Sequence, residues 1–211
     1  MRSRLVAGVL VVAVFAMFAA GAPVRAAASA LVAVNRCNGQ TIDEASARVR
    51  DYDRHPPSGN QAALLKRYGA LSEIIGTLNE EHEVLDSVCA SDEHQAALFS
   101  QIAATSALAL VLEADVATRL NGACPAAAAG LPTMMLADAW LALANVVNSQ
   151  NGTVPTSFND VIAKIQSRAS SLGLTLPAWP DTSAYWRDQV KNKAKEAIAT
   201  CSTPSPSPSP S

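Results

Sequence analysis

The sequence predicts an all-α fold: a disulfide-linked helical bundle of five to six helices, built on a long antiparallel helical hairpin. Three observations lead to this fold class. Apolar residues recur at spacings of three and four through most of residues 41–201, which is the period of packed helices. No segment shows the alternation of apolar and polar residues that is typical of strands. Four cysteines, Cys37, Cys89, Cys124 and Cys201, fall in the same part of the chain.

The first thirty residues have the order of a secretory signal peptide. Arg2 and Arg4 precede an uncharged apolar run over residues 5–22, and small residues suited to cleavage follow up to Ala30. We therefore expect residues 1–30 to be removed and the protein to be secreted, periplasmic or otherwise outside the cell. The alternative is an uncleaved N-terminal membrane anchor, because the apolar run is just long enough to span a bilayer. No later segment is expected to span a membrane.

Loss of the leader would leave an acidic protein. The chain has 16 basic and 18 acidic residues, and removal of Arg2, Arg4 and Arg25 leaves 13 basic residues against the same 18 acidic ones. The resulting net charge of −5, without any basic cluster, disfavours nucleic acid and other anionic partners. The expected partner is a protein or a small ligand, and the expected state is a monomer.

The first three helices can be placed from their start and stop signals. A T-x-x-E capping box at Thr41 opens the first helix, and Pro56 and Pro57 end it. An S-x-x-Q box at Ser58 opens the first long helix of the hairpin, and the hairpin covers residues 60–120. The break near Ser91 is very short, so the two helices of the hairpin must pack antiparallel. The first long helix has a predicted apolar seam of Leu64, Tyr68, Leu71, Ile75, Leu78, His82, Leu85 and Cys89.

The second half of the chain predicts shorter helices. An alanine-rich connector over residues 123–130 leads to helices at 132–147, 157–172 and 181–200. Together with residues 31–131 these form one helical domain that ends at residue 201. Residues 202–211 alternate Ser or Thr with Pro, so we expect a disordered tail that buries nothing.

The four cysteines predict two disulfides in an oxidising compartment. In the hairpin arrangement Cys89 and Cys124 lie at opposite ends, too far apart to be joined. We favour Cys37–Cys89 with Cys124–Cys201, and the alternative is Cys37–Cys124 with Cys89–Cys201. A zinc site is disfavoured because no two cysteines are close in the sequence.

His82 is the first candidate ligand-binding residue, since it is a titratable side chain in an apolar seam. Counted back across the tight turn, it should face Leu98, Phe99 or Ile102 on the next helix. It could ligate a metal or haem. The alternative is a core or boundary histidine beside an acidic hairpin tip.

Tyr52 and His55 form the second candidate site, because a phenol and an imidazole three residues apart can share one helical face. Both are possible axial haem ligands. The segment DYDRHP, which contains them, and the following NQA at residues 60–62 resemble secreted haemophore-type haem-binding domains of actinobacteria. The resemblance covers residues 37–62 and implies haem as a cofactor, with Tyr52 and His55 at the haem site. The structural alternative is that Tyr52 anchors the helix end and His55 is a turn residue.

The remaining polar candidates point to structure more than to chemistry. Glu113 lies on an apolar helix and is expected to accept a hydrogen bond from Tyr68. Asn151 begins an N-G-T acceptor for N-glycosylation, which matters only in a eukaryotic source.

No catalytic, nucleotide-binding or metalloprotease motif occurs in the chain, and no catalytic residue is predicted. We therefore expect an exported, non-enzymatic binding or interaction module. The alternative function is a carrier of haem or metal that uses Tyr52, His55 or His82.

Overall fold

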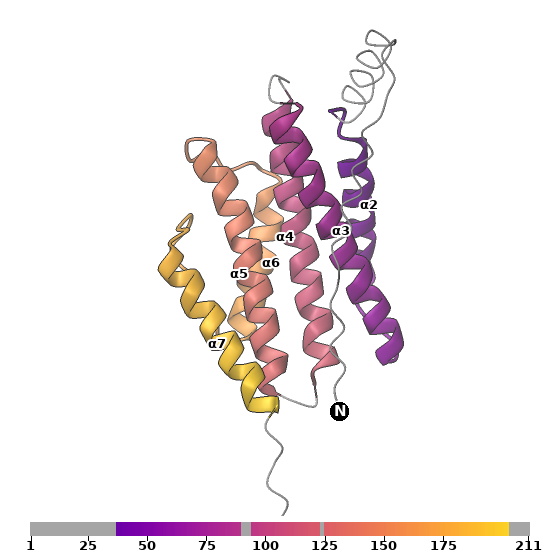
Figure 1. Ribbon diagram of the computed structural model, residues 1–211, viewed down its shortest axis with the longest axis vertical. Helices are drawn as coiled ribbons and strands as arrows, with labels where there is room; N and C mark the ends of the chain where they lie inside the picture. The colour runs from indigo at the N-terminus through magenta and orange to yellow at the C-terminus, as the bar shows by residue number, and fades with distance from the viewer. Residues whose placement is uncertain (1–36, 90–93, 123–124, 203–211) are drawn as a thin grey trace, which may run out of the picture. The chain divides into compact units, whose positions relative to one another are not determined.

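The computed structural model describes residues 37–89, 94–122 and 125–202, and within these ranges it contains six α-helices and no strand. Their bounds are α2 (Gln40–Arg54), α3 (Gln61–Ser87), α4 (Gln95–Leu120), α5 (Pro125–Ser149), α6 (Phe158–Ser171) and α7 (Ala184–Ser202). The predicted all-α bundle is confirmed (Figure 1).

The pair α3 and α4 forms the predicted antiparallel hairpin. Ser72, in the middle of α3, donates to Glu113, which lies far along the sequence in α4. Near the tip, Gln95 Nε2 donates to the Leu85 carbonyl oxygen over 2.9 Å. The sequence separation of the bonded residues falls from 41 in the middle of the pair to 10 near the tip, so the two helices run in opposite directions. They lie side by side in Figure 1.

Helix α4 is the centre of the bundle, since α2, α3, α5 and α6 all pack against it, and α7 packs on the far side of α5. Its sequence explains this position, because apolar and small residues occur on every face and a helix that is apolar all round must be buried. Its buried apolar residues are Ile102, Ala103, Ala107, Leu108, Ala109, Val111, Leu112, Ala114, Val116 and Ala117.

The two predicted capping boxes are wrong, although both helices begin within two or three residues of them. Helix α2 starts after Gly39, whose φ of 73° is left-handed, and no side chain caps it, so Thr41 lies inside the first turn. A Cβ on Gly39 would also come within 2.6 Å of a Leu98 side-chain carbon, which would have to move, and the positive φ favours glycine at this position. Helix α3 is capped by Asn60, whose side chain accepts from the Ala63 amide, and Ser58 lies outside the helix.

The apolar seam of α3 is rotated from the predicted one. Leu64, Leu71, Leu78 and Leu85 are buried as expected. The second row of the seam, however, contains Ile74 and Glu81, and the predicted row of Tyr68 and Ile75 is half-buried while His82 is exposed. Rows three and four residues from a leucine both lie beside it on a helix, so periodicity alone leaves the choice open. Because Glu81 is charged, the sequence pattern favoured the row that contains Ile75 over the row that contains Ile74 and Glu81.

Helix α5 begins earlier than predicted. The expected connector at residues 123–130 is helical from Pro125, and Pro132 lies inside the helix. Proline at the first helical position has no amide hydrogen to leave unpaired, and the alanines that follow it are the strongest helix formers. The breaker signal of Pro132 was therefore outweighed by the residues around it.

Helix α6 matches its prediction within one residue at each end, whereas α7 begins three residues late. The delay follows from a turn at residues 178–183. The Asp181 amide donates to the Ala178 carbonyl oxygen over 2.7 Å, and the Asp181 side chain accepts from the Ser183 amide over 2.9 Å. This side-chain contact forms a local turn that competes with the helix.

The predicted Cys37–Cys89 disulfide is present, with the two Cα atoms 5.7 Å apart. It fastens the segment before α2 to the end of α3. Since each cysteine forms one disulfide, the alternative pairing of Cys37 with Cys124 is wrong. The second predicted disulfide, Cys124–Cys201, stays a prediction, because Cys124 lies outside the described residues.

Among the described residues, two helical segments, Gln95–Leu120 and Gly130–Ser149, are long and apolar enough to cross a membrane when judged by length and composition alone. More than half of each apolar window is buried inside the bundle, as in the core helices of a soluble protein.

Candidate functional site

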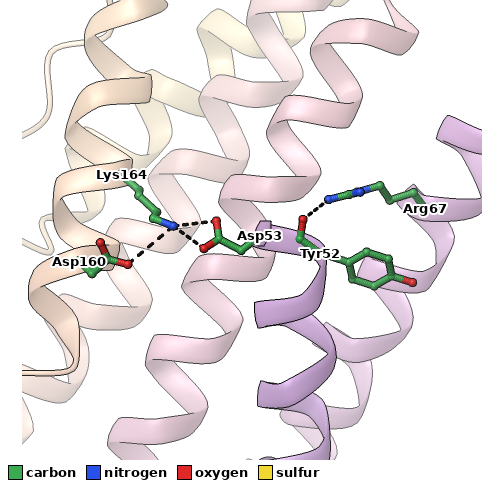
Figure 2. A network of polar contacts seen from close by, with 5 residues as sticks. All are labelled: Tyr52, Asp53, Arg67, Asp160 and Lys164. Carbon is green, nitrogen blue, oxygen red and sulfur yellow. Dashed lines mark hydrogen bonds and ion pairs between the residues drawn. The ribbon is translucent and has the colours of Figure 1, made fainter. Parts of the chain in front are cut away.

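Tyr52 lies in the last turn of α2 and is held by Arg67 of α3. The Arg67 guanidinium carbon is 4.9 Å from the centre of the Tyr52 ring, a cation–π contact. Arg67 Nη2 donates to the Tyr52 carbonyl oxygen and Nη1 to the His55 carbonyl oxygen, each over 2.5 Å (Figure 2 shows the first of these). A cation at the carbonyl end of a helix is a stabilising arrangement. The anchoring role expected for Tyr52 as the alternative to haem ligation is therefore supported.

His55 follows α2 directly and lies on the surface. Its side chain is 72% exposed, and Nδ1 is 2.8 Å from the Asp51 carbonyl oxygen and 3.4 Å from Asp51 Oδ1. Tyr52 and His55 thus lie at the same end of α2, as the sequence predicted. The described contacts of the two side chains are with Arg67 and Asp51, respectively.

The third candidate, His82, is far from this pair. It follows Arg67 by about four turns of α3, a rise of roughly 22 Å. One haem cannot reach both ends of α3, so the three predicted haem ligands form two separate sites. Among the described residues there is also no group of three or more His, Cys, Asp and Glu side chains that could hold a metal ion.

A charged network fastens α6 to α2 and α4. Lys164 Nζ lies 2.5 and 2.7 Å from the two carboxylate oxygens of Asp53 and 3.7 Å from Asp160 (Figure 2). Burial tends to lower the pKa of Lys164, but the hydrogen bond and charge of Asp53 outweigh it, so the pKa is raised. One turn further, Arg168 Nε lies 2.5 Å from Asp115 Oδ1 without the alignment of a hydrogen bond. All four side chains of these two bridges are about one-third exposed, so each pair contributes little net stability.

Glu113 is buried in α4 with only 5% of its surface exposed. Ser72 donates a hydrogen bond to its carboxylate, so the prediction that Tyr68 fills this role is wrong by one helical turn. Burial raises the pKa of the Tyr68 phenol, and the negative charge of Glu113 raises it further. Burial also raises the pKa of Glu113 above its ordinary 4.5, and the Ser72 hydrogen bond offsets part of the rise. The site is structural and holds one desolvated acid.

This acid predicts a pH dependence of stability. Because the folded pKa of Glu113 is raised, the folded state holds the proton more tightly, and stability is lost as the pH rises from the unfolded pKa through the folded one. We expect Glu113→Gln to be about as stable as wild type near pH 4 and more stable near pH 8, by urea unfolding. The control is Glu73→Gln, a change of an exposed acid, and its difference in unfolding free energy from wild type should be the same near pH 4 and near pH 8. A difference between Glu113→Gln and wild type that does not change with pH would contradict this assignment.

His82 lines a pocket of 400 Å³ between α3, α4 and α5. Its ring lies 4.8 Å from that of Phe99 at a tilt of 49°, which confirms that it faces this part of α4. The pocket walls are mixed. Asn79 and Asp86 join His82 from α3, Ile102 and Ala103 form an apolar wall from α4, and Asn145 and Val146 lie opposite on α5.

Ser106 is the residue of this pocket that the sequence did not indicate. It is 8% exposed, and its hydroxyl has no hydrogen-bond partner among the described residues. Ser100 and Thr118, on the same helix, instead donate to the carbonyl oxygen four residues earlier. An unpaired buried hydroxyl costs about 1–3 kcal/mol, which a ligand could recover by bonding to it. Its one sequence signal is a small polar residue on a helix that is apolar all round.

Another hollow, of 510 Å³, lies between α2, α4 and α6, but its buried polar groups are satisfied. Ser46 and Thr105 at its floor bond to each other over 2.7 Å. Charged side chains such as Arg50 and Asp53 line its outer part and are exposed or half-buried. A surface with all its buried groups paired gives no sign of a ligand, so the α3–α4–α5 pocket is the better candidate site.

Comparisons of the chain with protein-family models, with characterised proteins and with solved structures find no match. The resemblance of residues 37–62 to haemophore-type domains therefore stays a prediction, and function has to be inferred from the site itself.

Proposed function

We propose that the protein is a non-enzymatic binding module of the cell exterior and that the α3–α4–α5 pocket takes a small amphipathic ligand. The hydroxyl of Ser106 is the observation that carries the proposal, because this buried group has no hydrogen-bond partner among the described residues and Ser106 lines the pocket, where a ligand could pair with it. The volume of 400 Å³ and the mixture of apolar wall and few polar groups are those of small-molecule sites. The Cys37–Cys89 disulfide is compatible with export to an oxidising compartment.

The same pocket contains the residue types of a hydrolytic triad, Ser106, His82 and Asp86, so a hydrolase is the function to compare. Neither the Ser106–His82 pair nor the His82–Asp86 pair is hydrogen-bonded in the described structure. Ser106 also lies mid-helix, where the neighbouring amides are used by the helix itself and cannot form an oxyanion hole. The arrangement supports binding more than acyl transfer.

Binding can be tested with tyrosol, a neutral probe that combines an aromatic ring with two hydroxyl groups. We expect tyrosol to shift the amide resonances of Phe99, Ser106 and Val146 in a ¹⁵N-labelled sample. Ala142→Phe, which fills the pocket from α5, should weaken this binding by at least about tenfold.

The control is Ala104→Phe, a matched change at a half-buried alanine that lines the hollow between α2, α4 and α6. It should leave tyrosol binding unchanged. No shifts, or equal weakening by both variants, would overturn the proposal.

Haemin is a second probe in the same titration, and we expect no Soret shift with wild type. A Soret shift lost in His82→Ala would replace the small ligand with haem.

A further inference from the structure

We propose that the ligand of the α3–α4–α5 pocket is a small aromatic amine, bound as its ammonium cation, rather than a carboxylate or a neutral compound. This inference rests on the proposed function, because it names the chemical class that the same pocket selects. The observations that support it are the charge of the lining, the arrangement of the two rings and the position of the buried hydroxyl.

The charge of the lining favours a cation. Asp86 is the one carboxylate among the described residues that line the pocket, and none of them is Lys or Arg. A carboxylate ligand would be repelled by Asp86 with no Lys or Arg to offset the repulsion, whereas an ammonium group would be attracted.

The rings of His82 and Phe99 strengthen this preference. They are in contact, with centroids 4.8 Å apart and planes tilted by 49°, and both line the pocket together with Asp86. The face of a phenyl ring attracts cations, and aromatic side chains favour packing against a further aromatic group. An amine with an aromatic body can use the carboxylate and the rings together.

The inner part of the pocket suits the other end of such a molecule. Ile102, Ala103 and Val146 present apolar surface, and Ser106 is the deeply buried polar group there. A hydroxyl can both donate and accept, so a phenol at the end of the aromatic body would pair with Ser106. An ammonium at the rim, a ring in the middle and a hydroxyl at the inner end match the order of groups in the pocket.

Three probes of nearly the same size separate charge from shape: tyramine, tyrosol and para-hydroxyphenylacetate differ in carrying an ammonium, a hydroxyl and a carboxylate group. By calorimetry at low salt we expect tyramine to bind about tenfold more tightly than tyrosol, and the carboxylate to bind more weakly than tyrosol. Added salt should reduce the advantage of tyramine, because Asp86 is exposed.

Asp86→Asn identifies the group responsible. We expect it to bring tyramine to within about twofold of tyrosol and to leave tyrosol unchanged. Glu83→Gln, a matched change of an exposed acid on the same turn that does not line the pocket, should retain the preference. Equal binding of tyramine and tyrosol would overturn this inference while leaving the proposed function intact. Failure of all three probes to bind would overturn both.

Discussion

Replacing Trp140 with alanine is expected to lower the free energy of unfolding by about 3–5 kcal/mol, one of the largest effects of a single substitution in this protein. Trp140 lies in α5 with 2% of its surface exposed, and Trp179 packs edge-on against it with ring centres 4.7 Å apart. Removing the indole would leave a cavity where α5 meets the segment before α7. Urea unfolding followed by circular dichroism measures the loss.

Trp140→Phe is the control for this prediction. The Trp140 Nε1 group is buried without a hydrogen-bond partner among the described residues, so its removal relieves an unpaired donor while keeping an aromatic ring against Trp179. We expect this variant to lose well under half of what Trp140→Ala loses. An alanine variant within about 1 kcal/mol of wild type would contradict the buried position of this side chain.

Loss of the Cys37–Cys89 disulfide is the second large expected effect. The bond closes a loop with a sequence separation of 52, for which the chain-entropy relation gives about 4 kcal/mol of stabilisation through the unfolded state. The double variant Cys37→Ala/Cys89→Ala should therefore unfold at much lower urea concentration.

Each single variant serves as a control for the double variant, since either change alone breaks the same bond. All three proteins should lose a similar free energy, after alkylation of the remaining thiol in the single variants. A loss below about 1 kcal/mol would mean that the unfolded chain is already restricted at this loop.

The sequence was sufficient to predict the features that depend on local pattern and chain connectivity. The hairpin follows from two long apolar periods separated by a short break, and the Cys37–Cys89 pair follows from the position of each cysteine along that hairpin. The position of His82 against Phe99 could be counted across the turn for the same reason.

Features set by packing against other helices could not be predicted in this way. Whether the row of Ile74 or that of Ile75 faces the core depends on where the neighbouring helices lie, which α3 alone does not encode. The start of α5 at Pro125 depended on helix propensity prevailing over a breaker signal. The pocket itself needs α5 beside the hairpin tip, with Asn145 opposite His82, and no periodic pattern specifies that placement.

The two bridges of α6 have a consequence for how this helix moves. Phe158, Val161, Ile165 and Ala169 hold it by apolar burial, while Lys164 and Arg168, one turn apart, contact carboxylates on two different helices. Burial tolerates small rotations about the helix axis, whereas two ion pairs to α2 and α4 specify a single rotational setting. Concentrated salt should therefore leave the melting temperature nearly unchanged yet broaden the α6 resonances, as the helix samples neighbouring orientations on the bundle.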